Sequence, residues 1–213
     1  MYRAILSSAL LLAFVQIASA CPGQTGKIIF SDDFSDDSGG WDLDANVTVQ
    51  QGAMQIKTDP KVTTDGTLNS SFNAFEADYC AEFSFPPEPA ESNNNDDVGI
   101  YLLGTDYKNK FALTIDSAGQ AWINRTVNGD NAFLMPVTKE PSIKISPGAV
   151  NALRVVFKDQ KLTFFINGEQ IKVVRASVPD TANRFGLWAG LDKKAPQTVR
   201  IFSVKSYQVN QIP

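Results

Sequence analysis

The sequence contains no histidine among its 213 residues. Serine–histidine–aspartate triads, cysteine–histidine nucleophile pairs, histidine general bases and histidine-based zinc sites are therefore excluded. Carboxylates and tyrosine are what remains for acid–base chemistry. Lysine and arginine together number 19 against 23 aspartates and glutamates, and no basic cluster occurs in the chain. The resulting net charge of −4 argues against partners such as nucleic acid or an anionic membrane surface.

A long apolar run occurs at the N-terminal end of the chain, where residues 1–20 are typical of a signal peptide. Arg3 supplies a short positive region, an apolar region follows from Ile5 to Val15, and Ala18-Ser19-Ala20 is a small-residue cleavage site. The apolar region is too short to cross a bilayer, which favours a cleaved signal over a membrane helix. We therefore expect a secreted or periplasmic protein, and residues 21–213 have the length of one large domain.

Cysteine is scarce, with Cys21 and Cys80 as the two copies in the chain. In an exported protein two cysteines predict one disulfide, which here ties the mature N-terminus to the strand around Cys80. Closing a loop of about sixty residues stabilises the folded chain by roughly 4 kcal/mol. The alternative is that Cys21, directly after the cleavage site, is acylated as in a bacterial lipoprotein and anchors the protein to a membrane. Lipoprotein signals usually carry leucine where this chain has Ala18, so we favour the disulfide.

Helical periodicity is also absent, because no segment of ten or more residues repeats its apolar positions at helical spacing. Short segments of alternating hydrophobicity occur instead, and Val98–Leu103, Lys110–Asp116 and Gln120–Thr126 form the central three, with a turn expected at 104–106. Trp41 stands beside a Gly-Gly turn and is expected to pack in the core. Many short strands without a repeat predict an all-β protein, a two-sheet antiparallel β-sandwich or jelly roll.

Strand alternation also predicts a face that carries large aromatic side chains away from the core. If the small aliphatic residues of the third central strand pack inward, Trp122 and Asn124 point outward together, and Tyr101 shares the face of Leu103. Trp188 is flanked on its own face by glycines, which leave its ring uncovered, although a partly buried packing role is the alternative. Uncovered flat rings suit the apolar faces of sugars. We therefore predict a ligand-binding surface of Tyr101, Trp122, Asn124 and Trp188.

Acidic runs at 32–37 and 94–97 could offer oxygen ligands to calcium. Calcium needs six to eight oxygens drawn together, and neither run has the alternating spacing of a calcium loop. We therefore expect no cofactor and no metal site, with bound calcium as the alternative.

Several motifs in the sequence occur in a recognisable order. They are Asp32-Asp33-Phe34, the Gly-Gly-Trp at 39–41, the run at 97–119, NALRVVFKDQKLTFFINGEQI at 151–171 and RFGLWAG at 184–190. Together they resemble the concanavalin A-like lectin/glucanase superfamily, in particular the laminin-G-like jelly rolls and the related 3-keto-disaccharide hydrolase domains. The resemblance spans nearly the whole mature chain. It implies two antiparallel sheets with a concave face, on which relatives bind or cleave glycans.

Glucanases of this superfamily carry the strand motif E-x-D-x-E or E-x-D-x-x-E, which sets two carboxylates on one face at catalytic separation. Glu76, Asp78 and Glu82 also share one strand face here, but their segment has one residue more than the motif. Cys80 lies on the same face, and its disulfide would make that face an outer one. We therefore interpret it as a solvated strand face and keep the three carboxylates as the weaker catalytic candidates.

These observations predict a single β-sandwich domain of the concanavalin A-like jelly-roll type over residues 21–213. We expect it to bind a carbohydrate or other extracellular ligand on the concave sheet without catalysis. One alternative is a glycoside hydrolase resembling the 3-keto-disaccharide hydrolases, and another is a structural envelope domain without a small ligand. Two carboxylates inside an open groove would favour the enzyme, whereas scattered aromatic side chains would favour the structural domain.

Overall fold

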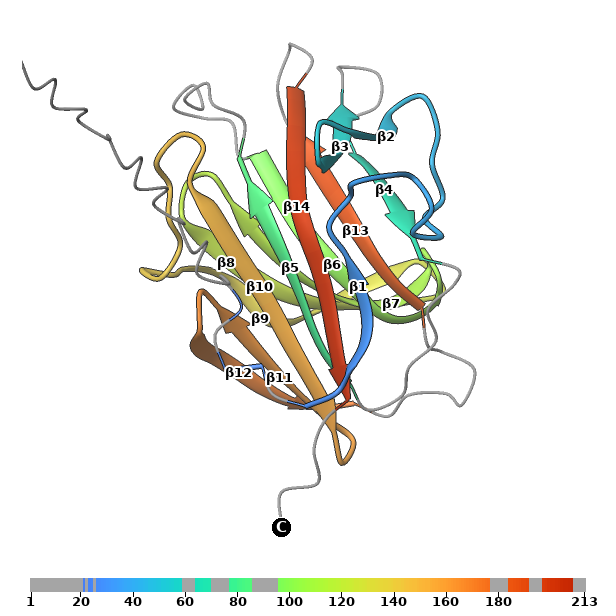
Figure 1. The fold of residues 1–213 in the computed structure, drawn as a ribbon. Helices are drawn as coiled ribbons and strands as arrows, with labels where there is room; N and C mark the ends of the chain where they lie inside the picture. The colour runs from blue at the N-terminus through green and yellow to red at the C-terminus, as the bar shows by residue number, and fades with distance from the viewer. Residues whose placement is uncertain are drawn as a thin grey trace, which may run out of the picture.

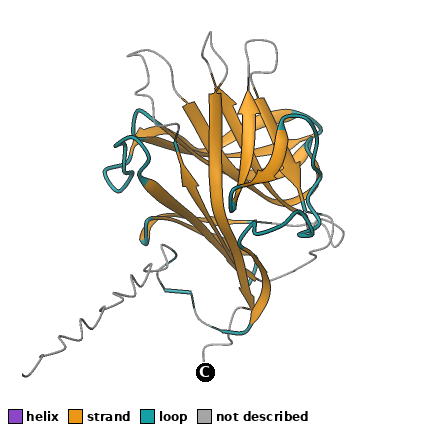
Figure 2. Cartoon of the chain, turned by 45° about the horizontal axis from the view of Figure 1, so that its top comes forward, coloured by secondary structure: helices purple, strands orange, loops and turns teal. Residues whose placement is uncertain are grey.

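The computed structural model describes residues 21, 23–24, 26–58, 64–69, 77–85, 96–176, 184–191 and 197–208. Regular structure in these residues consists of fourteen β-strands, drawn in orange in Figure 2. No helix in the described part is long and apolar enough to cross a membrane. The predicted signal peptide at 1–20 and the candidate Glu76 lie outside the described residues.

The strands form two antiparallel sheets that pack face to face (Figure 1). The larger sheet has eight strands in the order β12-β11-β10-β5-β14-β3-β2, with β1 pairing to β14. Its strands are β1 (Ile28–Asp32), β2 (Val47–Gln50), β3 (Ala53–Thr58), β5 (Ala77–Ser84), β10 (Val150–Lys158), β11 (Lys161–Ile166), β12 (Glu169–Arg175) and β14 (Gln197–Gln208).

The smaller sheet lies behind the larger one in the view of Figure 1 and has six strands in the order β4-β13-β6-β7-β8-β9. Three consecutive hairpin strands, β6 to β8, form its centre, as the sequence predicts. Its strands are β4 (Thr64–Leu68), β6 (Asp96–Asp106), β7 (Asn109–Asp116), β8 (Gln120–Val127), β9 (Asp130–Lys139) and β13 (Arg184–Leu191).

The core lies between the two sheets and is built from alternate residues of each strand. Phe83 and Phe164 enter it from the larger sheet, and Leu113 and Phe185 enter it from the smaller one, all four fully buried. Trp41 is also part of this core, as predicted. A sandwich of two antiparallel sheets is therefore confirmed.

The first central strand continues further than the sequence predicts, and the turn expected at 104–106 is wrong. Strand β6 runs to Asp106, and the chain turns at 107–108 instead. The register of β6 against β7 shifts between Leu102 and Asp106, and Leu103 has a positive φ of 51°. This bulge turns Leu103 into the main core, so Leu103 does not share the face of Tyr101 as expected.

The outer face of the larger sheet holds the N-terminal segment. Cys21 and Cys80 are joined by a disulfide with their Cα atoms 6.2 Å apart, which confirms the predicted pairing. On the same face Asp78 accepts two hydrogen bonds of 2.8 Å from the Nε and Nη2 atoms of Arg154. Asp78 is buried, so the expectation of a fully solvated face is wrong at this position. The segment held by the disulfide covers it, because Arg154 also donates to the carbonyl oxygen of Gly23.

Candidate functional site

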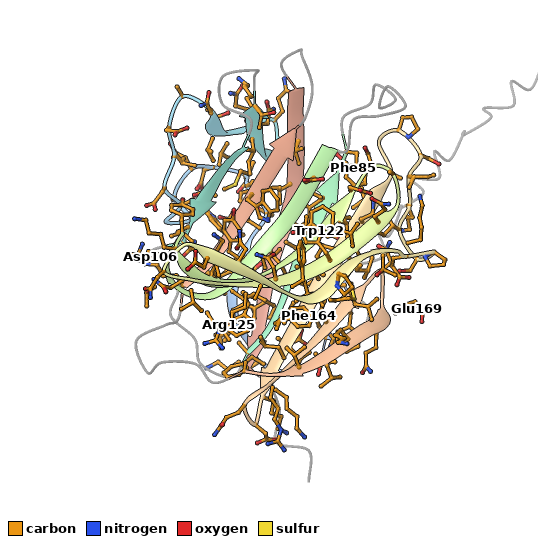
Figure 3. The ribbon with its side chains drawn as sticks, turned by 180° about the vertical axis from the view of Figure 1, so that it is seen from behind. Phe85, Asp106, Trp122, Arg125, Phe164 and Glu169 are labelled. Carbon is orange, nitrogen blue, oxygen red and sulfur yellow. A yellow bond between two sulfur atoms is a disulfide. The ribbon has the colours of Figure 1, made fainter. Side chains whose placement is uncertain are left out.

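A groove of about 260 Å³ lies on the outer face of the six-stranded sheet, on the side away from the core. Figure 3 looks at the molecule from this side, and the label on Trp122 marks the place. All four residues predicted to bind a ligand line the groove. Its lining, contributed by five neighbouring strands, consists of Tyr101, Lys110, Ala112, Trp122, Asn124, Thr126, Asn131, Phe133 and Trp188.

Strand register explains why these side chains meet. Residues paired across neighbouring antiparallel strands point to the same face of a sheet, so each row of paired residues crosses the groove. Two rows carry the aromatic residues. The first row is Gly66, Trp188, Gly99, Thr114 and Trp122, and the second is Leu68, Gly186, Tyr101, Ala112, Asn124 and Phe133.

Trp188 and Tyr101 form a stacked pair in the groove wall. Their rings are stacked with centroids 5.8 Å apart and an interplanar angle of 2°. The indole of Trp188 lies on Gly99, where an added Cβ would come within 2.2 Å of its Nε1 atom. Gly99 is therefore the residue that lets the ring lie close to the sheet. The Nε1 atom is buried there and has no hydrogen-bond acceptor in the described part of the chain.

Tyr101 contributes to the groove as a supporting residue more than as an open surface. Its side chain is 8% exposed, because Trp188 stacks on it and it packs with Leu68 and Ala112. Tyr107 meets the same ring edge to face, with centroids 6.1 Å apart. Trp122 and Trp188 are half-buried, and Phe133 is 61% exposed. The aromatic surface that a ligand would meet is therefore formed by Trp188, Trp122 and Phe133.

The polar side of the groove is a network of three side chains on β8 and β9. The Nδ2 atom of Asn124 donates to the Oδ1 atom of Asn131 at 3.1 Å. The hydroxyl of Thr126 donates to the same oxygen at 2.6 Å. These bonds fix the orientation of the Asn124 amide. Its carbonyl oxygen then remains available to accept a hydrogen bond from a ligand in the groove.

Lys110 is the one charged residue in the described lining. Its ammonium group lies 4.4 Å from the centroid of the Tyr101 ring and donates to the carbonyl oxygen of Tyr107. Partial burial lowers the pKa of Lys110, and the nearby Asp106 opposes this shift. Sequence reasoning missed Lys110, Asn131 and Phe133. The alternation of β7 could have indicated Lys110, which lies on the same strand face as Ala112.

Two carboxylates lie on the groove face without lining the groove. Asp97 and Asp116 are paired across β6 and β7, two residues beyond Gly99 and Thr114 along their strands. The Oδ1 atom of Asp116 accepts a hydrogen bond of 2.7 Å from the backbone N–H of Gln120, so this side chain caps the β7–β8 turn. Burial raises the pKa of Asp116 above its ordinary value of 3.8.

Solved structures with the same architecture include carbohydrate-active proteins. The carbohydrate-binding module CBM66 from Bacillus subtilis has 15% sequence identity and a TM-score of 0.61, over 79% of this chain and 95% of the module. The β-glucanase of Bacillus licheniformis has 12% identity and a TM-score of 0.63, over 87% of this chain and all of the enzyme. The catalytic domain of an endo-1,3-β-glucanase (laminarinase) from Thermotoga petrophila has 11% identity and a TM-score of 0.60, over 87% and 98%.

The chain has the concanavalin A-like lectin/glucanase fold. Glucanases and a carbohydrate-binding module share this fold, and at these identities the likeness establishes the architecture alone. The sequence itself matches no family profile and no curated protein.

The carboxylates singled out by comparison with concanavalin A-like glucanases lie elsewhere in this sandwich. Asp78 and Glu82 are on β5 of the eight-stranded sheet, and their parity places them on its outer face with Cys80. The groove is on the outer face of the other sheet, so the whole core separates it from these two carboxylates. Asp78 is also held in its ion pair with Arg154.

The acidic loop after β1 forms a second, polar hollow of about 420 Å³. The carboxylates of this loop accept hydrogen bonds from nearby residues. The oxygens of Asp32 accept from the N–H of Phe34 and from the Nε1 atom of Trp41, both at 2.8 Å. Hydrogen bonds from Ser35 and Ser38 lower the pKa of Asp33 and Asp36. Within the described residues, no three acidic or cysteine side chains gather as a metal site would require.

Proposed function

We propose that this protein is a secreted, non-catalytic glycan-binding domain, which holds a sugar ring in the groove over β13, β6, β7, β8 and β9. The observation that carries the proposal is the pair of half-buried tryptophans, Trp188 and Trp122, which lie in one cross-strand row on either side of Gly99 and Thr114. Indole rings present flat apolar surfaces, and the C–H faces of sugar rings are of matching polarity.

The remainder of the lining also suits a sugar. Binding sites for small ligands combine apolar walls with a few fixed polar groups that set orientation. Asn124, Thr126 and Asn131 provide such groups, already ordered by their mutual hydrogen bonds. The volume of about 260 Å³ is slightly below the range of roughly 300–1,000 Å³ for sites that enclose drug-sized ligands. An open groove of this size suits one ring of a longer chain.

Secretion is part of the proposal and is supported by two features. The N-terminal twenty residues have the composition of a signal peptide, and Cys21 and Cys80 form a disulfide. Disulfides form and persist in oxidising compartments, which favours an extracellular or periplasmic location.

Binding without hydrolysis is favoured because no aspartate or glutamate belongs to the described lining of the groove. Glycoside hydrolysis needs two carboxylates flanking the scissile bond. If the protein were a hydrolase acting at this groove, Asp97 and Asp116 would be the candidate catalytic pair, because they lie on the groove face. We therefore expect no release of reducing sugar from β-glucans. Release that is abolished by Asp116→Asn would overturn the non-catalytic assignment.

The experiment that tests binding is a glycan array probed with the mature protein and with Trp122→Ala. Val173→Ala is the control, because it truncates an exposed apolar side chain on β12 of the opposite sheet. A stacked ring contributes about 1 kcal/mol beyond area burial, so Trp122→Ala should weaken binding fivefold to about tenfold. Glycan binding that does not depend on Trp122 would show that the binding site lies elsewhere on the protein. If no glycan binds, the alternative of a structural domain without a small ligand is favoured.

A further inference from the structure

One end of the groove is formed by a third cross-strand row, which consists of Lys110, Thr126 and Asn131. This row differs from the two aromatic rows in being polar throughout. All three side chains line the groove, and they come from three neighbouring strands, β7, β8 and β9.

The hydrogen bonds of this row leave mainly donors for a ligand. The Oδ1 atom of Asn131 accepts from both Asn124 and Thr126. The amide N–H groups of Asn131 have no partner among the described residues. The ammonium group of Lys110 has three N–H donors and gives one to the carbonyl oxygen of Tyr107, which leaves two.

The positive charge of Lys110 at this end of the groove is not balanced by an ion pair. The single ion pair within the described residues is the one between Asp78 and Arg154, so Lys110 has no carboxylate within ion-pair distance there. Asp106 is near enough to act on Lys110, but its Oδ1 atom already accepts from the N–H of Lys108 and from the amide of Asn109. Partial burial disfavours the charged form of Lys110 and lowers its pKa. A partly desolvated cation of this kind is stabilised by a bound anion.

We propose that the groove selects an anionic sugar, with its ring against Trp188 and Trp122 and its carboxylate or sulfate group at Lys110 and Asn131. This inference rests on the proposed glycan-binding function and specifies its ligand class. A uronate and a sulfate ester share the relevant chemistry, because each presents several negatively charged oxygens to N–H donors. Neutral sugars would use the aromatic surface and leave the ammonium group unpaired.

The test is calorimetric titration of the mature protein with two matched pairs of oligosaccharides. One pair is tetragalacturonate and its full methyl ester, and the other is a sulfated galactan oligosaccharide and its desulfated form. We expect the charged member of at least one pair to bind at least tenfold more tightly, since hydrogen bonds to charged groups contribute about that much. The pair that shows the preference identifies the anionic group as carboxylate or sulfate.

Lys110→Gln removes the charge and should abolish the preference for the charged member of the pair. Lys110→Arg keeps the charge and should retain most of the preference for the charged ligand. Lys108→Gln is the matched control, because Lys108 carries the same charge two residues away and does not line the groove. A preference that survives Lys110→Gln, or equal binding of both members of each pair, overturns the inference.

The two proposals fail in different ways. If Trp122→Ala weakens binding while Lys110→Gln leaves the ratio of charged to neutral ligand unchanged, the groove binds glycans and the anionic selectivity is wrong. If glycans bind and Trp122→Ala has no effect, the proposed site itself is wrong, and the selectivity assigned to it falls with it.

Discussion

The indole of Trp188 stacks in parallel on the ring of Tyr101, with centroids 5.8 Å apart. The two rings come from neighbouring strands, β13 and β6, and the glycine paired with each ring leaves room for it. Trp188 therefore has two roles, because it covers Tyr101 and also forms part of the groove wall. Truncation of Trp188 should therefore lower both the stability of the fold and the affinity for a ligand in the groove.

Trp188→Ala should weaken glycan binding about tenfold and lower stability by roughly 1–2 kcal/mol, less than the 3–5 kcal/mol typical of a core aromatic. Trp41→Ala is the matched control, since Trp41 is 7% exposed and packs against Phe30, Phe34 and Phe185. Urea unfolding gives the free energy of unfolding of both variants. If Trp188→Ala costs as much stability as Trp41→Ala, Trp188 is a core residue and its part in the groove is secondary.

Trp188→Phe separates stacking from the indole N–H. The Nε1 atom of Trp188 is buried without an acceptor in the described part of the chain. Removing an unsatisfied donor offsets much of the lost packing, so we expect a change in stability below about 1 kcal/mol. Affinity for glycans should fall less than with Trp188→Ala. A large loss of stability would instead indicate that the N–H has a partner in solution.

Gly99→Ala should displace the Trp188 ring, because the added Cβ would meet its Nε1 atom at 2.2 Å. Overpacking of this kind costs about 1–3 kcal/mol. A double-mutant cycle with Trp188→Ala isolates the ring contact from the contact with the carbonyl oxygen of Leu113 at 2.7 Å. We expect Gly99→Ala to cost less when Trp188 is already truncated. Additive effects would show that the backbone contact alone explains the loss.

Asp78→Asn should destabilise the protein by about 3–5 kcal/mol, because it leaves the Arg154 guanidinium largely buried without its counter-ion. Asp78→Asn with Arg154→Met should recover most of this loss, since no unpaired charge remains. Chemical unfolding of the single and double variants is the measurement. Glycan binding should be unchanged in folded Asp78→Asn, whereas its loss would connect this face with the groove.

Cys21→Ser should lower stability by roughly 4 kcal/mol, because it opens a loop that spans 59 residues of sequence separation. Peptide mass analysis without reduction should find Cys21 linked to Cys80 in the secreted protein. A diacylglyceryl group on Cys21 would contradict the disulfide and place the protein on a membrane.

The sandwich could be predicted from the sequence because two-residue alternation reports directly which side chains face a core. The same alternation placed Trp122 and Asn124 on one face, and the structure brings both to the groove. It failed at Leu103, where a bulge with positive φ reverses the facing of the chain. Alternation carries no information about such irregularities, which depend on how two strands pair.

Burial by neighbouring strands was the other part that sequence alone could not predict. Tyr101 faces the groove as expected, but Trp188 covers it from β13, a strand distant in sequence. Asp78 faces outward as expected, but it is buried there, with Gln24 donating to its carboxylate and Gly23 accepting a hydrogen bond from its partner Arg154. Both results depend on long-range contacts that no local pattern encodes.

The pKa of Asp116, raised by burial, predicts a specific dependence of stability on pH. In the unfolded chain Asp116 ionises near its ordinary pKa of 3.8, while in the folded protein it keeps its proton to higher pH. The folded state therefore binds more protons across that interval, and stability falls as pH rises through it. Above the folded pKa the loss is complete and constant.

Asp116→Asn should remove this loss, because an amide oxygen can still accept the hydrogen bond from Gln120 without carrying charge. The stability of Asp116→Asn relative to wild type, from urea unfolding at a series of pH values, should rise from pH 4 upward and then level off. Asp33→Asn is the control of opposite sign, since hydrogen bonds from Ser35 lower the pKa of Asp33. Its wild-type carboxylate contributes stability above the ordinary pKa of 3.8, and that contribution is lost on acidification. If Asp116→Asn instead loses stability relative to wild type as pH rises, the ionised carboxylate is favoured in the fold, and the turn hydrogen bonds outweigh burial.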